Sequence, residues 1–248
     1  MHRFFVAPEN IYGQIVHIDA AQARHIEKVL RLKAGDPVLV FDGAGNEYQV
    51  KLLEKEKEIL KAEIEVKVAT HREQAVRIIL VQGIPKGDKM DTIIQKAVEI
   101  GVTSIIPLTS AYSVVRLTSD KAVKKVQRWQ LIAQEACKQC RRNTIPKVEA
   151  VSDFTALFNN MGENPVIMLY EHESQIRLGT ILKANRHCFM EREIYLLVGP
   201  EGGFSPQEVE EARRCNVFVA GLGPNILRTE TAGLTAAGIV LYEYGELG

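Results

Sequence analysis

Two glycine-rich stretches hold the residues whose types and spacing could do chemistry. The first, GPEGG at residues 199–203, lies between an apolar run and a helix start marked by Ser205, Pro206 and Glu208. That pattern predicts a capping box with proline in the first helical turn. The second stretch reads AGLGPNILRTETA at residues 220–232. Glycines allow the backbone to approach a flat ligand closely and to offer its N–H and C=O groups. The alternative is that these glycines only turn tight corners.

Neither stretch is a standard phosphate-binding loop. Both depart from GxxxxGK[ST] and from GxGxxG, the patterns whose glycines cradle phosphates. Glu201 would also repel a polyphosphate, whereas a carboxylate suits hydroxyl groups, an amine or a cation. An adenosine that carries a positive centre meets these requirements.

The elements that position both stretches lie in the second part of the chain. Strands are predicted at Arg77–Ile84, Ser104–Leu108, Val166–Tyr170, Ile194–Val198 and Val217–Gly221, and helices at Asp88–Ile100, Ser119–Cys140, Ser174–Asn185, Ser205–Arg214 and about Thr229–Tyr244. Continuous apolar strands alternating with amphipathic helices indicate a parallel α/β sheet covered on both faces. Ligands bind such sheets beyond the carboxyl ends of the strands, where both glycine-rich stretches fall. A third strand end, LYEH at residues 169–172, is predicted to complete the pocket wall.

The first part of the chain has a different texture. Short β-type runs at Pro37–Phe41, Glu47–Leu53 and Ile59–Val68 are separated by turn signals, with one helix predicted at Ala20–Leu30. This pattern indicates a small β-rich domain with little room for a catalytic pocket. The polar stretch at residues 70–74 is the predicted linker.

Composition limits the class of protein. The 248 residues are 46% hydrophobic and 25% charged, with a net charge of zero, so contacts with nucleic acid must come from local patches. We expect a cytoplasmic protein, because the chain shows neither a secretory h-region nor an apolar run of roughly 20 residues. Cys137 and Cys140 form a CxxC inside a predicted helix, without the partners of a zinc or redox site. We therefore predict reduced thiols and no metal.

One segment departs from the overall charge balance. Residues 116–147 contain nine basic residues and two acidic ones, a net charge of +7. Val123, Val126, Ala133 and Cys137 form an apolar stripe along its helix, which leaves the cations outward. The one-sided sign favours a track for phosphates, although a solvated helix face is the ordinary alternative. Trp129 is predicted to pack in the core rather than to stack on a base.

The motifs together resemble a known family. GPEGGFS (residues 199–205) and LGPNILRTETA (222–232) are similar to the paired C-terminal motifs of the RsmE family. This family comprises ribosomal RNA uridine-N3 methyltransferases of the SPOUT superfamily. The resemblance extends over almost the whole chain. It includes HIEKVLRLKAGD (25–36), PKGDKMDTIIQKAVEIGV (85–102) and RWQLIAQEACKQCRRNTIP (128–146).

The resemblance implies an architecture, a cofactor and a substrate. It implies an α/β fold with a small PUA-like β-barrel domain at residues 1–72, which binds RNA. A SPOUT methyltransferase domain with a trefoil-knotted parallel sheet follows at 73–248, with the knot and the cofactor site at about 166–235. It further implies a homodimer that binds S-adenosylmethionine and methylates one uridine of 16S rRNA in the small ribosomal subunit.

The resemblance and the uridine chemistry assign roles to residues. The predicted S-adenosylmethionine contacts are Leu169, Tyr170, Glu171, Gly199, Pro200, Glu201, Gly202, Gly203, Leu222, Gly223, Ile226, Leu227 and Thr229. Uridine N3 carries a proton, so a cation beside O2 or O4 helps by stabilising the anion. Arg228 is the candidate for that role, and Glu230 for a proton acceptor or an organiser of Arg228. The alternative is that these two side chains pair with each other.

The predicted RNA contacts are basic residues from both parts of the chain. They are Arg3, Arg31, Lys86, Lys89, Arg116, Arg128 and Arg142. Tyr112 and Pro224-Asn225 stand where the family pattern leads us to expect basic residues. Three other functions stay open: a related enzyme acting on another base or on tRNA, a non-catalytic RNA-binding factor, and a nucleotide hydrolase. The hydrolase is disfavoured because the chain has neither a phosphate loop nor metal carboxylates.

Overall fold

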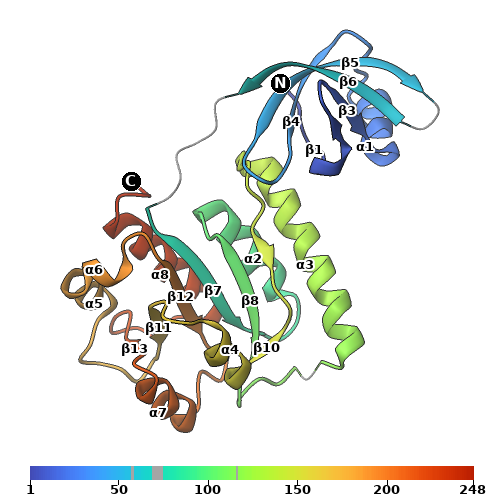
Figure 1. The fold of residues 1–248 in the computed structure, drawn as a ribbon. Coiled ribbons are helices and arrows are strands. Elements are labelled where there is room, and N and C mark those ends of the chain that lie inside the picture. The colour runs from blue at the N-terminus through green and yellow to red at the C-terminus, as the bar shows by residue number, and fades with distance from the viewer. Residues whose placement is uncertain (57–58, 69–74, 116) are drawn as a thin grey trace. The chain divides into compact units, whose positions relative to one another are not determined.

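The computed structural model describes residues 1–56, 59–68, 75–115 and 117–248 (Figure 1). The chain forms two compact units. One comprises Met1–Arg72 together with Cys137–Ile145, and the other comprises Glu73–Ala136 with Pro146–Gly248. The predicted linker at 70–74 and Arg116 lie outside the described residues.

The N-terminal unit is a curled six-stranded sheet in the order β1-β4-β5-β6-β3-β2. Its strands are β1 (Arg3–Phe5), β2 (Ile11–Tyr12), β3 (Ile15–Ile18), β4 (Pro37–Phe41), β5 (Glu47–Glu56) and β6 (Ile59–Val68). Register shifts between β5 and β6 at Gln49/Val50 and Leu52/Lys55 increase the local twist. The predicted β-rich fold is confirmed. The edge strands β1 and β2 do not pair within the described residues, so the sheet is a half-barrel rather than a closed barrel.

The helix predicted at Ala20–Leu30 has two parts. Asp19 caps α1 (Ala20–Arg24) by accepting hydrogen bonds from the backbone N–H groups of Ala21 and Gln22. A π-helical turn, η2 (His25–Val29), then follows. Its Ile26 packs with Ala23 of α1 in the sheet's apolar core. A short 3-10 turn, η1 (Pro8–Asn10), lies between β1 and β2.

The C-terminal unit contains the predicted parallel sheet, with strand order β10-β8-β7-β12-β11-β13 and β9 also paired to β8. Its strands are β7 (Arg77–Gly83), β8 (Ser104–Thr109), β9 (Lys147–Val148), β10 (Ser152–Asp153), β11 (Val166–Leu169), β12 (Glu193–Val198) and β13 (Phe218–Ala220). All described pairings of these strands are parallel. The fold class predicted from the apolar strand pattern is therefore confirmed.

Helices cover both faces of this sheet (Figure 1). They are α2 (Lys89–Ile100), α3 (Ser119–Cys140), α4 (Phe154–Asn160), α5 (Leu178–Ala184), α6 (Arg186–Phe189), α7 (Pro206–Arg214) and α8 (Thr229–Glu243). Alternate residues of β7 separate the two layers. Ile79 and Val81 belong to the cluster that contains side chains of α4 and α7, whereas Leu80 and Gln82 face Gly233 of α8.

Helix α3 buries fewer of its predicted apolar residues than its sequence suggests. Trp129 is 2% exposed, which confirms that it packs in the core, and Ala133 and Cys137 are also buried. Val123, predicted to begin the stripe, is 57% exposed, and Leu131 is 61% exposed. The predicted apolar stripe is therefore buried at Ala133 and Cys137 but not at Val123, in the first turns of the helix.

Helix α5 begins later than predicted, at Leu178 instead of Ser174. Glu173 Oε1 accepts hydrogen bonds from the N–H groups of Gln175 and Ile176, at 2.9 and 3.1 Å. Gly221 then pairs with this segment, donating to Ile176 O at 2.9 Å and accepting from Leu178 N at 3.2 Å. These contacts hold the backbone extended where the local pattern indicated a helix. The trefoil knot implied by the resemblance stays a prediction.

Candidate functional site

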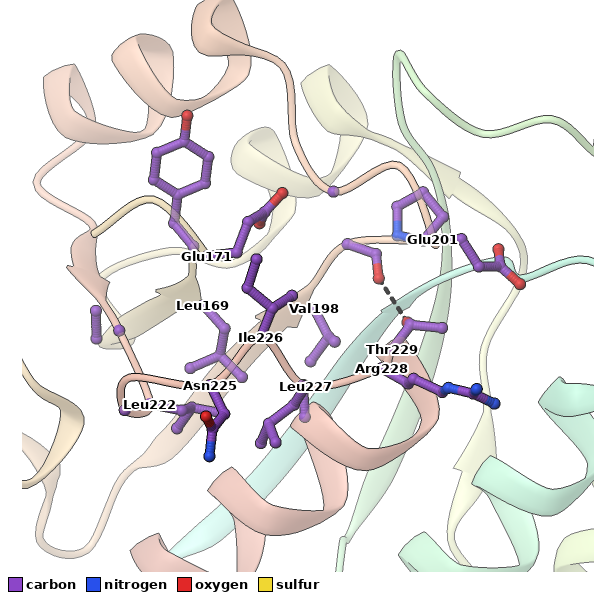
Figure 2. A pocket seen from close by; sticks show the side chains of 18 of the residues that line it. Leu169, Glu171, Val198, Glu201, Leu222, Asn225, Ile226, Leu227, Arg228 and Thr229 are labelled. Carbon is purple, nitrogen blue, oxygen red and sulfur yellow. Dashed lines mark hydrogen bonds between the residues drawn. The ribbon is translucent and has the colours of Figure 1, made fainter. Parts of the chain in front are cut away.

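The two glycine-rich loops meet at the carboxyl edge of the sheet. Val198 of β12 pairs with Leu169 of β11, which pairs in turn with Ala220 of β13. The loops that follow β12 and β13 therefore start on either side of the end of β11. They enclose a cavity of about 340 Å³ (Figure 2), a size typical of small-ligand sites. Its lining is Lys89, Leu169, Tyr170, Glu171, Val198, Gly199, Pro200, Glu201, Gly203, Ala220, Gly221, Leu222, Gly223, Asn225, Ile226, Leu227, Arg228, Thr229 and Ala232.

Nearly all of the predicted cofactor contacts lie in this lining. The exception is Gly202, where an added Cβ would lie 2.9 Å from Tyr112 Cβ. The structure thus brings the predicted residues together in one cavity. That these residues bind a cofactor stays a prediction.

Close packing explains the glycines of the first loop. An added Cβ at Gly199 would lie 2.8 Å from the carbonyl carbon of Gly203. Gly203 itself has a φ of +68°, a conformation that side chains other than glycine rarely adopt, and its N–H donates to Pro200 O at 2.9 Å. The interpretation as a tight corner is correct for this part of the site. Gly223 in the second loop differs, because an added Cβ there would meet nothing within 4 Å.

A buried relay of hydrogen bonds joins the loops to the sheet. Thr229 Oγ1 donates to Gly199 O at 2.6 Å and accepts a hydrogen bond from Gln82 Nε2 at 2.8 Å (Figure 2). Gln82 Nε2 also donates to Gly83 O at 3.0 Å. The sequence analysis did not single out Gln82. The signal that could have found it is an amide side chain inside the apolar run of β7, and the structure shows this side chain fully buried. The relay fixes the Gly199 carbonyl, and with it the start of the first loop.

The first loop ends in the capping box that the sequence predicted. Ser205 Oγ accepts from Glu208 N at 3.2 Å, and Ser205 N donates to Glu208 Oε2 at 2.8 Å. The other carboxylate oxygen, Glu208 Oε1, accepts from Ala111 N at 2.8 Å. Glu208 therefore fixes the start of α7 and the segment after β8 with one buried side chain.

The cavity has an apolar region and a charged region. Leu169, Val198, Leu222 and Leu227 supply apolar surface, whereas Lys89, Glu201 and Arg228 supply charge. Figure 2 shows Glu201 and Arg228 extending to the same side, away from Leu222. A ligand with a flat apolar part and a charged part matches this division.

Lys89, one of the predicted RNA contacts, lies in the cavity wall. Its Nζ is 3.0 Å from Glu201 Oε1 and 3.4 Å from Glu230 Oε2. The hydrogen bond with Glu201 raises the pKa of Lys89, against a smaller opposing effect of burial. Burial alone would raise the pKa of Glu201, but hydrogen bonds from Lys89 and from backbone N–H groups, including that of Lys86, hold it below the ordinary value. The pair is therefore ionised at neutral pH.

The alternative interpretation, in which Arg228 and Glu230 pair with each other, does not match the structure. Glu230 lies within ion-pair distance of Lys89, and it is not part of the cavity lining. Arg228 lines the cavity, and within the part of the chain that the structure describes its guanidinium forms no ion pair. Arg228 thus keeps its donors for a ligand, and Glu230 organises Lys89 rather than Arg228.

Arg3 is a structural residue and not the RNA contact that we predicted. Its side chain is 7% exposed and forms an ion pair of 2.6 Å with Glu47. The same guanidinium donates to Cys137 O and Arg142 O and lies over the Phe41 ring. Four hydrogen bonds inside the N-terminal unit and a nearly buried side chain leave Arg3 little surface to offer a phosphate.

The other predicted RNA contacts differ in whether their side chains are exposed, buried or already paired. Arg128 forms an ion pair with Asp91, and burial lowers the pKa of Arg142. Arg31 and Lys86 are exposed. Arg31 and Lys86 therefore stay the best placed of the set, while Arg116 lies outside the described residues.

Two negative findings concern the described residues. No helix in these ranges is both long enough and apolar enough to cross a bilayer. No three His, Cys, Asp or Glu side chains of the described chain gather as a metal site would require. The four cysteines are free thiols, and burial raises the pKa of Cys137 to about 12.

Comparison with known proteins identifies the family. Residues 72–241 match the model of the RNA methyltransferase domain, and residues 18–65 match that of the RNA methyltransferase PUA domain. Ribosomal RNA small subunit methyltransferase E of Bacillus subtilis is 35% identical over 228 residues, which are 91% of this chain and 89% of that protein. The chain belongs to the ribosomal RNA small subunit methyltransferase E family.

Other members of the methyltransferase E family agree in sequence and in structure. The protein of Buchnera aphidicola (Schizaphis graminum) is 30% identical over 235 residues, covering 95% of this chain and 93% of its own length. The Neisseria gonorrhoeae enzyme, whose crystal structure contains bound S-adenosyl methionine, is 36% identical in sequence to this chain. The two structures superpose over 98% of each chain with a TM-score of 0.85. The resemblance found in the sequence motifs is confirmed.

Proposed function

We propose that this protein transfers a methyl group from S-adenosylmethionine to N3 of a uridine in the 16S rRNA of the small ribosomal subunit. The observation that carries the proposal is the cavity between the two glycine-rich loops, which is lined by Arg228, a cation without an ion-pair partner among the described residues. Membership of the methyltransferase E family supports it, as does the S-adenosyl methionine bound by the Neisseria relative.

The residues of the cavity fit that cofactor. Leu169, Val198 and Leu227 offer apolar surface for the adenine ring, and the open space at Gly223 admits a ligand beside the backbone. The exposed Glu171 carboxylate suits ribose hydroxyl groups or the amino group of the methionine part. The loops and the charged side chains thus serve different parts of one ligand.

The reaction places its demand on the uridine. S-adenosylmethionine supplies an electrophilic methyl group: the N3–C bond forms as the C–S bond breaks, the C–S electron pair stays on sulfur, and the N3 proton leaves to water or a carboxylate. The protein must therefore stabilise the uridine anion. The Arg228 guanidinium has five donors and is placed to contact a carbonyl oxygen of the base, as in an oxyanion hole. Glu230 as proton acceptor stays a prediction.

Binding of RNA is assigned to exposed cations. Lys121, Lys124 and Arg141 are exposed along and just after α3, and they join Arg31 and Lys86 as candidate phosphate contacts. Such contacts release counterions, so affinity for rRNA is expected to fall steeply with salt concentration. Fluorescence anisotropy with a labelled rRNA fragment over a salt series tests this, and a flat response would contradict it.

The proposal includes a homodimer. Ile226 at the cavity is 76% exposed, and Tyr112, whose Cβ lies against Gly202, is 48% exposed. Apolar side chains exposed together beside a pocket are typical of surfaces that a partner covers. Sedimentation equilibrium at micromolar concentration is expected to give twice the monomer mass, and a monomer that still methylates RNA would contradict the dimer.

The decisive experiment is methyl transfer with a labelled donor. Purified small subunits, naked 16S rRNA and bulk tRNA are compared, and the product is digested to nucleosides. We expect label in 3-methyluridine from the 16S rRNA. Label in another nucleoside or in tRNA would reassign the substrate, and cofactor binding without transfer to any of these RNAs would favour a non-catalytic factor.

A further inference from the structure

Lys89 occupies an unusual position for a cation. It is the first residue of α2, and the positive end of a helix dipole disfavours a positive charge there. Two carboxylates offset this cost, Glu201 from the loop after β12 and Glu230 from α8. Three separate elements therefore converge to hold one ammonium group in the cavity wall.

The ammonium group still has a donor to offer. A lysine has three N–H donors. Lys89 donates one of them to Glu201 Oε1 at 3.0 Å, while Glu230 Oε2 lies 3.4 Å from Nζ at ion-pair distance without a hydrogen bond, so at least one donor remains. The side chain is 38% exposed and lines the cavity. The remaining donor is therefore available to a ligand.

The neighbouring charges keep Lys89 protonated. The groups that face it from other elements are Glu201 and Glu230, and α2 itself carries Asp91, which pairs with Arg128. Lys89 thus acts as a fixed positive charge and not as a base. Lys86 N also donates to Glu201 at 3.2 Å, which steadies the carboxylate that holds the lysine.

The target base needs more than one such charge. When uridine loses its N3 proton, negative charge spreads onto O2 and O4, which lie on opposite sides of N3. One cation can contact only one of these oxygens closely. Arg228 and Lys89 both line the charged part of the cavity, and they come from the N-cap of α8 and the first turn of α2.

We infer that Lys89 is a second catalytic cation, whose ammonium group contacts the uridine carbonyl oxygen that Arg228 does not. The inference rests on the proposed function, because it needs a uracil base in the cavity. Glu201 and Glu230 are then positioning residues, which orient Lys89 toward the base. In the methyl transfer, Lys89 stabilises the anion without giving up its own proton, and the N3 proton leaves to water or a carboxylate.

The test compares Lys89→Met with Lys96→Met and the wild type. Lys96 lies on the same helix and pairs with Glu99, so its replacement removes an equal charge outside the cavity. Single-turnover methyl transfer to small subunits is measured from about pH 6 to pH 10, and cofactor affinity by calorimetry. We expect Lys89→Met to react about 100-fold more slowly at neutral pH, with cofactor affinity changed less than about threefold. The deficit shrinks as pH rises, because alkali ionises the base without help. Lys96→Met should match the wild type.

Four outcomes overturn the inference. The first is a Lys89→Met rate within about twofold of the wild type. The second is a deficit that stays constant across pH, and the third is a deficit accompanied by loss of cofactor affinity. The second and the third outcomes would make Lys89 a structural support for the Glu201 loop. The fourth is a wild type that binds the cofactor but forms no 3-methyluridine, which refutes the proposed function and removes the inference with it. Thermal melting of Lys89→Met identifies a misfolded variant, and Lys89→Arg then replaces it, with the loss of rate expected to be smaller because the charge is retained.

Discussion

The two glycine-rich loops look alike in sequence but differ in what surrounds their glycines. In the first loop, protein atoms fill the space beside each of Gly199, Gly202 and Gly203. In the second, Gly221 abuts Glu173 O, but the space beside Gly223 is open. The first loop therefore needs glycine so that the chain can pack on itself, and the second keeps room beside its backbone. Arg228, which lines the cavity, follows the second loop. The first loop is thus the more tightly packed of the two, and the second leaves space for a ligand beside Gly223.

The largest effect is expected from Arg228→Ala. Removing the cation should lower kcat by about 100- to 1,000-fold, or roughly 3–4 kcal/mol, while cofactor affinity and melting temperature stay near the wild type. Arg214→Ala is the control, because that exposed arginine pairs with Glu210 on α7, outside the cavity lining. Unchanged kcat in Arg228→Ala would remove the second loop from the chemistry.

Gly199→Ala should act on the fold instead. Its Cβ would press on the backbone of Gly203, and overpacking of this kind costs about 1–3 kcal/mol. Urea unfolding should show the loss, with activity falling in parallel. Gly179→Ala in α5 is a matched control, since the space beside it is open and alanine favours a helix. If Gly199→Ala were as stable as that control, the contrast between the loops would fail.

Thr229→Val should weaken the joint between the loops. Valine retains the shape but leaves the Gly199 carbonyl and the Gln82 amide without their shared partner. Buried groups left unsatisfied cost about 1–3 kcal/mol, to be measured by urea unfolding. A cost near zero would mean that the first loop holds its form without the relay.

Gly223→Ala is expected to have the smallest effect and the most selective one. The methyl group enters open space, so folding stability should change by less than about 0.5 kcal/mol. Cofactor affinity, measured by calorimetry, should fall about fivefold, roughly 1 kcal/mol, because the ligand loses room. Equal losses of stability and affinity would show that the second loop is packed like the first.

Much of this arrangement could be predicted from the sequence because it follows from local patterns. The apolar strands, the capping box at Ser205 and the glycine-rich strand ends all depend on neighbours within a few residues. These patterns placed the cavity at the correct edge of the sheet. Arg228 was proposed from the resemblance and from the chemistry of uridine, and its role stays a prediction.

The residues whose surroundings the sequence did not reveal have partners far away in the chain. Lys89 meets Glu201 across 112 residues, and Arg3 meets Arg142 O across 139. The late start of α5 likewise depends on Gly221. A basic side chain looks the same in sequence whether it faces solvent or a buried carboxylate. Charge alone could therefore not reveal the carboxylate partners of either residue.

The buried relay of hydrogen bonds through Thr229 restricts which amino acids can occupy position 229. The oxygen must give its single hydrogen to Gly199 O and receive another from the Gln82 amide. An aliphatic side chain can do neither, and a carboxylate at neutral pH can only receive. Serine alone shares the short aliphatic hydroxyl, so a library randomised at this codon and selected for methylation should return threonine and serine.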